Sequence, residues 1–167
     1  MGLAEDLLSQ APHLVALDPK RPKQASLRRA ISTSYYAVFH LLTANAALRF
    51  IPKRPVGLIP RVERAFSHRE MKQACFAFNR RPLVDPLRTL LDKSLSDELR
   101  SIAVAFIDLQ EERHKADYDT GAVFSRPATL AILARADAVF ANWRAIESTD
   151  EATVFLAPLA FAARWSK

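Results

Sequence analysis

The sequence predicts an all-α protein, folded as an antiparallel helical bundle of five to six helices. Apolar residues recur at spacings of three and four along several stretches, as in amphipathic helices. The chain has three glycines against ten prolines, which is a poor supply for β-hairpins because their turns favour glycine. Long segments without either residue alternate with proline-containing breaks. With 50% hydrophobic content, the 167 residues suit one domain, 1–167, with a buried core.

The first two helices are expected at residues 3–17 and 23–50, separated by Asp18-Pro19 and Pro22. The second helix has an apolar seam made of Leu27, Ile31, Tyr35, Val38 and Leu42. A second line of residues on its opposite side is polar and aromatic and consists of Arg29, Thr33, Tyr36 and His40. A helix with two such faces is expected to be covered on both sides. For Tyr36 and His40, packing with a satisfied polar tip and ligand binding both stay open.

The middle of the chain is expected to contain a loop, a third helix and a break. Residues 51–60 hold three prolines and Gly57, and they present Lys53 and Arg54 as an exposed basic loop. A third helix is predicted over residues 60–78, with Val62, Phe66, Met71, Cys75 and Phe78 toward the core. Residues 79–86 form the second break, with Arg80 and Arg81 exposed.

The central helix is predicted over residues 95–118, antiparallel to the second helix. Its apolar seam comprises Leu95, Leu99, Ile102, Phe106 and Leu109, and it begins at Ser94 or Ser96. The next seam position is Arg113, with Asp117 on its flank, and a guanidinium on a core-facing stripe is costly unless paired or exposed to a cleft. One interpretation is that the helix ends near Glu112, so that the apolar stripe is already exposed to solvent there. The other is that a polar site at a bundle end or dimer seam is lined by Arg113, His114, Asp117 and Tyr118.

The last part of the chain is expected to hold two further helices. Residues 119–121 form a helix-ending turn, with Gly121 as a left-handed cap. Ser125 and Pro127 begin a helix that runs to Ile146. The sequence Ser148-Thr-Asp-Glu151 predicts a capping box for a C-terminal helical extension, residues 148–167, which Pro158 should kink or divide.

Composition excludes several classes of site and partner. No apolar run approaches the roughly 18 residues that cross a bilayer, and the acidic N-terminus is unlike a secretory signal, so we expect no membrane partner and a cytoplasmic protein. A single cysteine, Cys75, excludes an internal disulfide and a Cys-based zinc site within one chain. The chain has no glycine-rich phosphate loop and no HExxH helix, and its four histidines show no acidic-ligand pattern. We therefore expect no cofactor and no metal.

Charge is unevenly distributed along the chain. Residues 20–81 contain 14 Lys/Arg against two Glu, a balance of +12, whereas the remainder has 10 basic and 16 acidic residues, a balance of −6. Such a chain suits a polyanion on one side, a head-to-tail dimer or a solvated helix surface. Charge alone does not decide between them.

Three segments resemble the HEPN superfamily of helical bundles: residues 27–40 (LRRAISTSYYAVFH), residues 112–119 (ERHKADYD), and between them residues 64–72 (RAFSHREMK). The resemblance covers roughly residues 3–146. It implies an antiparallel bundle, usually a homodimer, with a polar cluster facing the dimer cleft. Many relatives are metal-independent ribonucleases, often toxins of toxin–antitoxin or phage-defence systems. Others are non-catalytic modules beside a nucleotidyltransferase.

The resemblance implies that Arg113 is the arginine of the ribonuclease motif and that His114 takes the polar position after it. In catalytic relatives four to six residues separate the arginine from a following histidine, and here that slot falls on Tyr118, Asp119 or Thr120. Tyrosine, with an unperturbed pKa of about 10, is a poor proton shuttle at neutral pH. His114 lies about 100° round the helix from Arg113, so we expect the two side chains to face different directions. The matching spacing of Arg61 and His68 lies in another helix and is interpreted as coincidence.

Two functions remain open from the sequence. The first is a non-catalytic HEPN-like module that binds a nucleotide, RNA or a partner protein, with a nucleotidyltransferase or an antitoxin as candidate partner. Its ligand-binding candidates are Arg29, Tyr36, His40, Arg113, Asp117 and Tyr118, together with the basic residues of 20–81. The second is a metal-independent endoribonuclease that uses Arg113 with His114 or His40. The missing downstream histidine favours the first.

Overall fold

The computed structural model describes residues 2–51, 55, 57–91 and 95–165, and these form helices and loops without a strand. The helices are α1 (Leu3–Ala16), α2 (Gln24–Phe50), α3 (Leu58–Glu63), α4 (His68–Asn79), α5 (Leu87–Leu90), α6 (Asp97–Tyr118), α7 (Arg126–Ile146) and α8 (Asp150–Trp165). The predicted all-α class is confirmed. The described residues form eight helices rather than five or six, because α5 was not predicted and the expected third helix is two helices.

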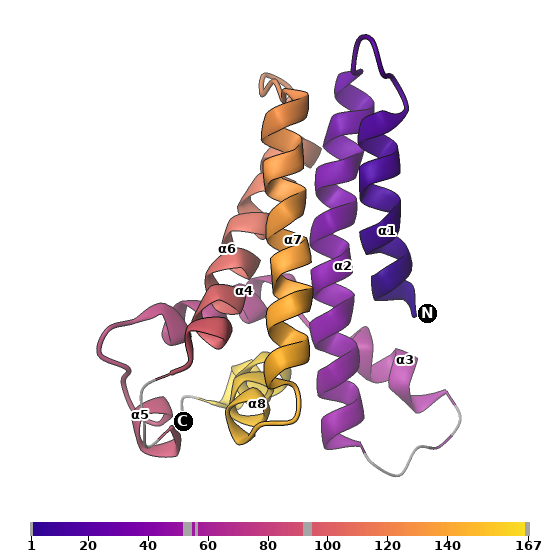
Figure 1. The fold of residues 1–167 in the computed structure, drawn as a ribbon. Helices are drawn as coiled ribbons and strands as arrows, with labels where there is room; N and C mark the ends of the chain where they lie inside the picture. The colour runs from indigo at the N-terminus through magenta and orange to yellow at the C-terminus, as the bar shows by residue number, and fades with distance from the viewer. Residues whose placement is uncertain (1, 52–54, 56, 92–94, 166–167) are drawn as a thin grey trace.

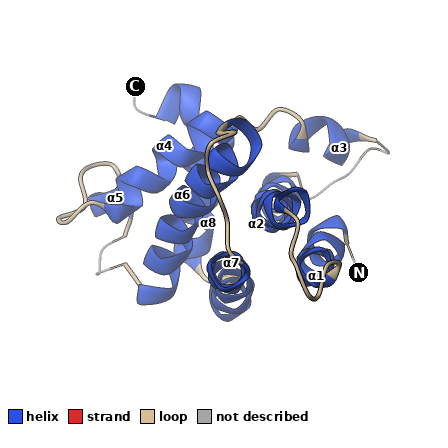
Figure 2. Ribbon diagram, turned by 90° about the horizontal axis from the view of Figure 1, so that it is seen from above, coloured by secondary structure: helices blue, strands red, loops and turns tan. Residues whose placement is uncertain are grey.

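The helices α1, α2, α6 and α7 stand side by side, and α1 and α6 run opposite to α2 and α7 (Figure 1). Seen from above, α2 lies between α1 and the rest of the bundle (Figure 2), and it contacts α1, α6, α7 and α8. The helices α4 and α8 contact each other and α6. The helix α2 is therefore the central helix of the fold, in contact with α1, α3, α6, α7 and α8.

The core is built on the two apolar seams that the spacing predicted. The α2 seam, made of Leu27, Ile31, Tyr35, Val38 and Leu42, is fully buried, and so are Leu99, Ile102, Phe106 and Leu109 of α6. Burying a large apolar side chain stabilises the fold by about 1.5–3 kcal/mol, so these two seams are a major source of stability. They also fix the rotation of α2 and α6 about their axes, and with it the direction of every polar residue beside the seams.

The helix expected over residues 60–78 is interrupted before Ser67. Ser67 has an extended backbone, φ −99° and ψ 124°, and its hydroxyl accepts a hydrogen bond from the backbone N–H of Glu70 at 3.4 Å. This side chain starts α4 anew. Met71, Cys75 and Phe78 are fully buried as predicted, whereas Val62 and Phe66, before the interruption, are only half-buried. The predicted basic loop residues Lys53 and Arg54 lie outside the described residues.

Two predicted caps are corrected by the structure. Gly121 does not adopt a left-handed conformation, since Gly57 is the one residue with positive φ in the described part of the chain. The turn after α6 is instead stabilised by the Asp119 carboxylate, which accepts hydrogen bonds from the backbone N–H groups of Gly121 and Ala122 at 2.9 and 3.2 Å. At the start of α8 the hydroxyl of Thr149, rather than that of Ser148, accepts a hydrogen bond from Ala152 N–H at 3.3 Å.

The remaining predictions for the C-terminal part agree with the structure. Ser125 caps α7 by accepting a hydrogen bond from Ala128 N–H at 3.3 Å. The helix α8 departs from helical geometry at Phe161, three residues after Pro158, with φ −121° and ψ 24°. None of the helices within the described ranges combines the length and the apolar character that crossing a bilayer requires.

Candidate functional site

The centre of the candidate site is Arg113, the residue at which the apolar seam of α6 turns polar. Its Nη2 donates a hydrogen bond to the hydroxyl of Tyr36 on α2 at 2.7 Å. Its Nε lies 2.8 Å from Oδ2 of Asp117, one turn further along α6. The side chains of Arg113 and Asp117 are 17% and 28% exposed, so this ion pair is neither fully buried nor freely solvated. The structure therefore shows Arg113 in a paired, cleft-facing position.

Three tyrosine rings surround the guanidinium. Its Cζ lies 5.9 Å from the ring centre of Tyr35, 5.4 Å from that of Tyr36 and 5.6 Å from that of Tyr118. Each distance is within the range of a cation–π interaction. Burial acts to lower the pKa of Arg113, but the hydrogen bond to Tyr36 and the nearby Asp117 outweigh it and raise the pKa above its ordinary value. Arg113 is thus a permanent cation whose position is fixed from two helices.

Asp117 connects the cluster back to α2. One of its oxygens, Oδ1, accepts a short hydrogen bond from the hydroxyl of Ser32, and the other faces Arg113. The contact between Oδ2 and Arg113 is an ion pair without a directed hydrogen bond, because Nε has no hydrogen-bond partner of ordinary geometry among the described residues. Nη1 of Arg113 also makes no hydrogen bond within the described ranges. Nη1 is therefore the part of the guanidinium without a described partner, whereas Nε is buried against Asp117.

The structure adds His68, a residue that the sequence analysis did not select. It is the first residue of α4, and its Nδ1 lies 2.6 Å from the hydroxyl of Tyr35. Its ring packs 4.1 Å from the ring centre of Phe39, and its backbone carbonyl accepts a hydrogen bond from Nε2 of Gln110 at 3.1 Å. Residues of three helices thus hold one imidazole beside the Arg113 cluster.

The pKa shifts of His68 and Tyr35 both favour the neutral form of the side chain. Burial, followed by the charge of Arg113 and then by His40, lowers the pKa of His68. Burial likewise raises the pKa of the Tyr35 phenol, so this hydroxyl stays protonated. His68 is therefore a neutral imidazole near pH 7, and Arg113 lies close enough to influence its charge.

Arg113 and His114 both line one groove, with Arg113 bonded to Tyr36 and His114 packed against Tyr118. The groove lies between α4 and α6, has a volume of about 380 Å³, and is lined by Arg69, Lys72, Gln110, Glu111, Arg113, His114 and Lys115. Two of its cations are paired with carboxylates, Lys72 with Glu111 and Lys115 with Glu112, each at 3.0 Å. The exposed ring of His114 lies 4.9 Å from that of Tyr118. Three of the four cations of this groove, Lys72, Arg113 and Lys115, are therefore paired with carboxylates.

A second groove, between α1 and α2, contains the other predicted binding residues. Its volume is about 420 Å³, and it is lined by Leu3, Leu7, Gln10, Leu14, Arg29, Thr33, Tyr36 and His40. Tyr36 belongs both to this groove and, through its hydroxyl, to the Arg113 cluster. Burial lowers the pKa of His40, and Glu63 acts in the opposite direction. The structure thus brings Arg29, Tyr36 and His40 to one groove, and joins it to Arg113, Asp117 and Tyr118 through Tyr36.

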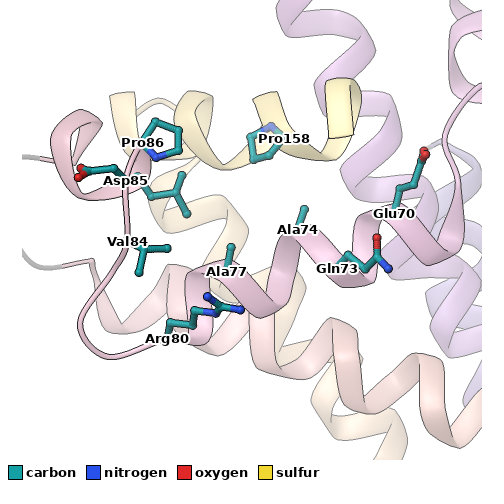
Figure 3. Close-up of a pocket in the computed structure, with 10 residues that line it drawn as sticks. Glu70, Gln73, Ala74, Ala77, Arg80, Val84, Asp85, Pro86 and Pro158 are labelled. Carbon is teal, nitrogen blue, oxygen red and sulfur yellow. The ribbon is translucent and has the colours of Figure 1, made fainter. Parts of the chain in front are cut away.

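A third cavity lies apart from these residues. Figure 3 shows it between α4 and α8, closed at one end by the segment that carries Val84, Asp85 and Pro86. Its volume is about 280 Å³, and much of its wall is apolar, from Ala74, Ala77 and Pro158 among others. None of the predicted site residues lines it, and its charged side chains are Glu70, Arg80 and Asp85.

Metal and thiol chemistry find no support in the described part of the chain. No group of three or more His, Cys, Asp or Glu side chains is placed there to hold a metal ion. Cys75 is buried, and burial raises the pKa of its thiol, which leaves it a poor nucleophile. The chemistry at the site therefore rests on Arg113, His68 and the tyrosines.

Comparisons of the chain with protein-family models, curated proteins and solved structures give no match. The functional argument accordingly depends on the site itself. The site offers a guanidinium held by Tyr36 and Asp117, with the exposed ring of Tyr118 beside it.

Proposed function

We propose that this chain is a HEPN-like, non-catalytic module that binds the phosphate of a nucleotide or of RNA at Arg113. The observation that carries the proposal is the placement of Arg113, hydrogen-bonded to Tyr36 and bordered by Asp117 and Tyr118 at the edge of a groove. A phosphate group uses two guanidinium donors at once, and a base stacks on an aromatic ring.

The arrangement of the three HEPN-like segments supports this proposal. Residues 27–40 supply Tyr35 and Tyr36, residues 112–119 supply Arg113 and Asp117, and residues 64–72 supply His68. Segments that are distant in the sequence thus contribute to one cluster. A resemblance that arose from helical composition alone would not require its segments to meet at one polar position.

The module is proposed to work as a homodimer within a toxin–antitoxin or nucleotidyltransferase-associated system. The groove between α1 and α2 supports dimerisation, because it combines apolar residues with polar ones beside the site and Leu3 at its rim is 58% exposed. An antitoxin or nucleotidyltransferase encoded next to this protein would identify the paired system.

A metal-independent ribonuclease is the second candidate, and the position of His68 favours it. An imidazole whose Nδ1 is bonded to Tyr35 offers Nε2 for proton transfer, and the guanidinium beside it stabilises developing negative charge. The position where catalytic relatives carry histidine is filled here by the exposed Tyr118, which favours binding over cleavage. The second candidate requires that total RNA be degraded by the wild type and spared by both Arg113→Ala and His68→Ala.

The first experiment measures binding of single-stranded RNA and of ATP to Arg113→Ala by fluorescence anisotropy and calorimetry. We expect the affinity to fall about tenfold or more, since a charge-assisted bidentate contact is lost. Because the Arg113–Asp117 pair is partly exposed, its loss should cost about 1 kcal/mol of stability or less. Arg135→Ala is the matched control, since Arg135 forms an exposed pair with Asp108 at 3.5 Å away from both grooves. Unchanged affinity in Arg113→Ala, or an equal loss in Arg135→Ala, contradicts the proposal.

A further inference from the structure

The position of His68 relative to Arg113 is the feature that the proposed function leaves unexplained. Both residues lie against the same two rings: His68 is 5.6 Å from Tyr35 and 5.9 Å from Tyr36, and Arg113 is 5.9 and 5.4 Å from them. Tyr35 and Tyr36 belong to α2, whereas His68 belongs to α4 and Arg113 to α6. The tyrosine pair therefore acts as a spacer that sets the separation of an imidazole and a guanidinium.

The hydrogen bond to Tyr35 determines which ring nitrogen of His68 carries the proton. Tyr35 is buried and its phenol stays protonated, and among the described residues its hydroxyl contacts no hydrogen-bond acceptor other than Nδ1 of His68, so we assign the hydroxyl as the donor and Nδ1 as the acceptor. The neutral ring then carries its proton on Nε2. Nε2 makes no hydrogen bond to any residue that the structure describes, although the side chain is partly exposed. His68 thus presents an N–H donor without a partner among the described residues, and its ring lies against the same two tyrosine rings as Arg113.

The ring of His68 is also held rigidly enough to act as a binding group. Phe39 packs on it at 4.1 Å, Tyr36 meets it edge-on, and Gln110 of α6 fixes the backbone of His68 through its carbonyl. A donor that is fixed before the ligand arrives loses little conformational entropy on binding. Packing in the core explains the stacking of His68 on Phe39. It does not account for the N–H donor at Nε2, which lies across the ring from Nδ1, the nitrogen bonded to Tyr35.

We propose that His68 is a second anion-binding residue of the Arg113 site, donating Nε2–H to the same phosphate group that Arg113 holds. The ligand phosphate then spans from α4 to α6 across the edge of Tyr36. This inference rests on the proposed function and deepens it, since it assigns the site a tetrahedral oxyanion held from two helices.

The proposal has a pH dependence with a definite sign. In the free protein His68 is neutral near pH 7, because burial, Arg113 and His40 lower its pKa. A bound anion favours the imidazolium, so the pKa of His68 rises on binding and affinity increases as the pH falls. The other titratable or charged groups around the ring are Tyr35, Tyr36 and His40 from α2, Arg113 from α6, and Arg69 and Glu70 on α4 itself.

The test measures affinity for a rhodamine-labelled single-stranded RNA, whose phosphodiesters do not titrate near neutral pH. We compare the wild type with His68→Gln, His40→Gln and His114→Gln. We expect the wild type to bind roughly tenfold more tightly at about pH 5.5 than at about pH 8, as for a gained charge-assisted hydrogen bond. His68→Gln should weaken binding and remove most of this dependence, whereas His40→Gln and His114→Gln should retain it. A His68→Gln variant with the affinity and pH profile of the wild type overturns the proposal.

A second measurement on the unmutated protein covers the case in which His68→Gln does not fold. The pKa of each imidazole is followed by NMR with and without saturating sodium sulfate. We expect the pKa of His68 to rise in sulfate while that of the exposed His13 on α1 stays constant. An unchanged pKa of His68 in the presence of sulfate overturns the inference. Absence of any RNA or sulfate binding by the wild type instead contradicts the proposed function itself, so the two failures are distinguishable.

Discussion

Asp117 is the residue that determines whether Arg113 is available to a ligand. Its carboxylate faces the guanidinium at 2.8 Å and is held in place by the hydroxyl of Ser32. A carboxylate is a natural competitor of phosphate for a guanidinium, so Asp117 occupies part of the space that a ligand phosphate needs. Asp117 therefore orients Arg113 while reducing its free charge.

Removing this charge should strengthen binding. We expect Asp117→Asn to bind single-stranded RNA several-fold more tightly, because the competing anion is lost while the amide oxygen still accepts from Ser32. Asp108→Asn, which removes the carboxylate facing Arg135, controls for the general change of net charge. Anisotropy titrations at fixed ionic strength measure both variants. Equal affinities for Asp117→Asn and the wild type would show that Asp117 does not compete with the ligand.

At the scale of single residues, part of the candidate site could be predicted from the sequence. Arg113 and Asp117 follow from periodicity, because a charged residue on an apolar seam can be recognised in the sequence alone. Their i, i+4 spacing on one helix also brings them within reach of each other. His68 lies on another helix, and its approach to Tyr35 depends on where α4 begins and how it packs on α6. Local spacing contains no such information, so His68 was set aside.

The positions of the long helices were predicted well from the sequence, and the residues at which helices begin and end were predicted less well. The seams of α2 and α6 repeat over many turns, so a single ambiguous residue cannot change the prediction. A helix end, by contrast, depends on one or two side chains. Ser67 interrupts the third helix, Asp119 takes the part expected of Gly121, and Thr149 takes the part expected of Ser148. In each case several residues nearby were chemically able to form the cap.

The start of α8 provides a direct test of this correction. Thr149→Ala removes the hydroxyl that accepts from Ala152 N–H and should cost about 1 kcal/mol of unfolding free energy. Ser148→Ala is the matched variant, one residue earlier in the chain, and should change stability by less than about 0.5 kcal/mol. Urea denaturation followed by circular dichroism measures both. A larger loss in Ser148→Ala than in Thr149→Ala would restore the capping box that the sequence suggested.

The uneven charge along the chain does not translate into an equally uneven surface. Arg28 of the basic segment donates to the backbone carbonyls of Ala116 and Ala122, at the end of α6 and in the turn beyond it. Arg49 donates to Thr153 and to the carbonyl of Glu147, and Lys72 pairs with Glu111. Because α2 contacts most of the bundle, two of its three cations, Arg28 and Arg49, hold helices together and are not available to a polyanion. The charge balance of residues 20–81 thus overstates the basic surface.

At the scale of the whole molecule, the prediction concerns the proposed homodimer. If a second copy covers the groove between α1 and α2, light scattering should give a dimer at tens of micromolar protein. Leu3→Asp should shift it toward monomer, because Leu3 lines that groove and is 58% exposed. Leu130→Asp is the control, since Leu130 on α7 is 46% exposed but lines neither groove. A monomeric wild type would remove the dimer from the proposal and leave Arg113 and His68 as a site completed within one chain.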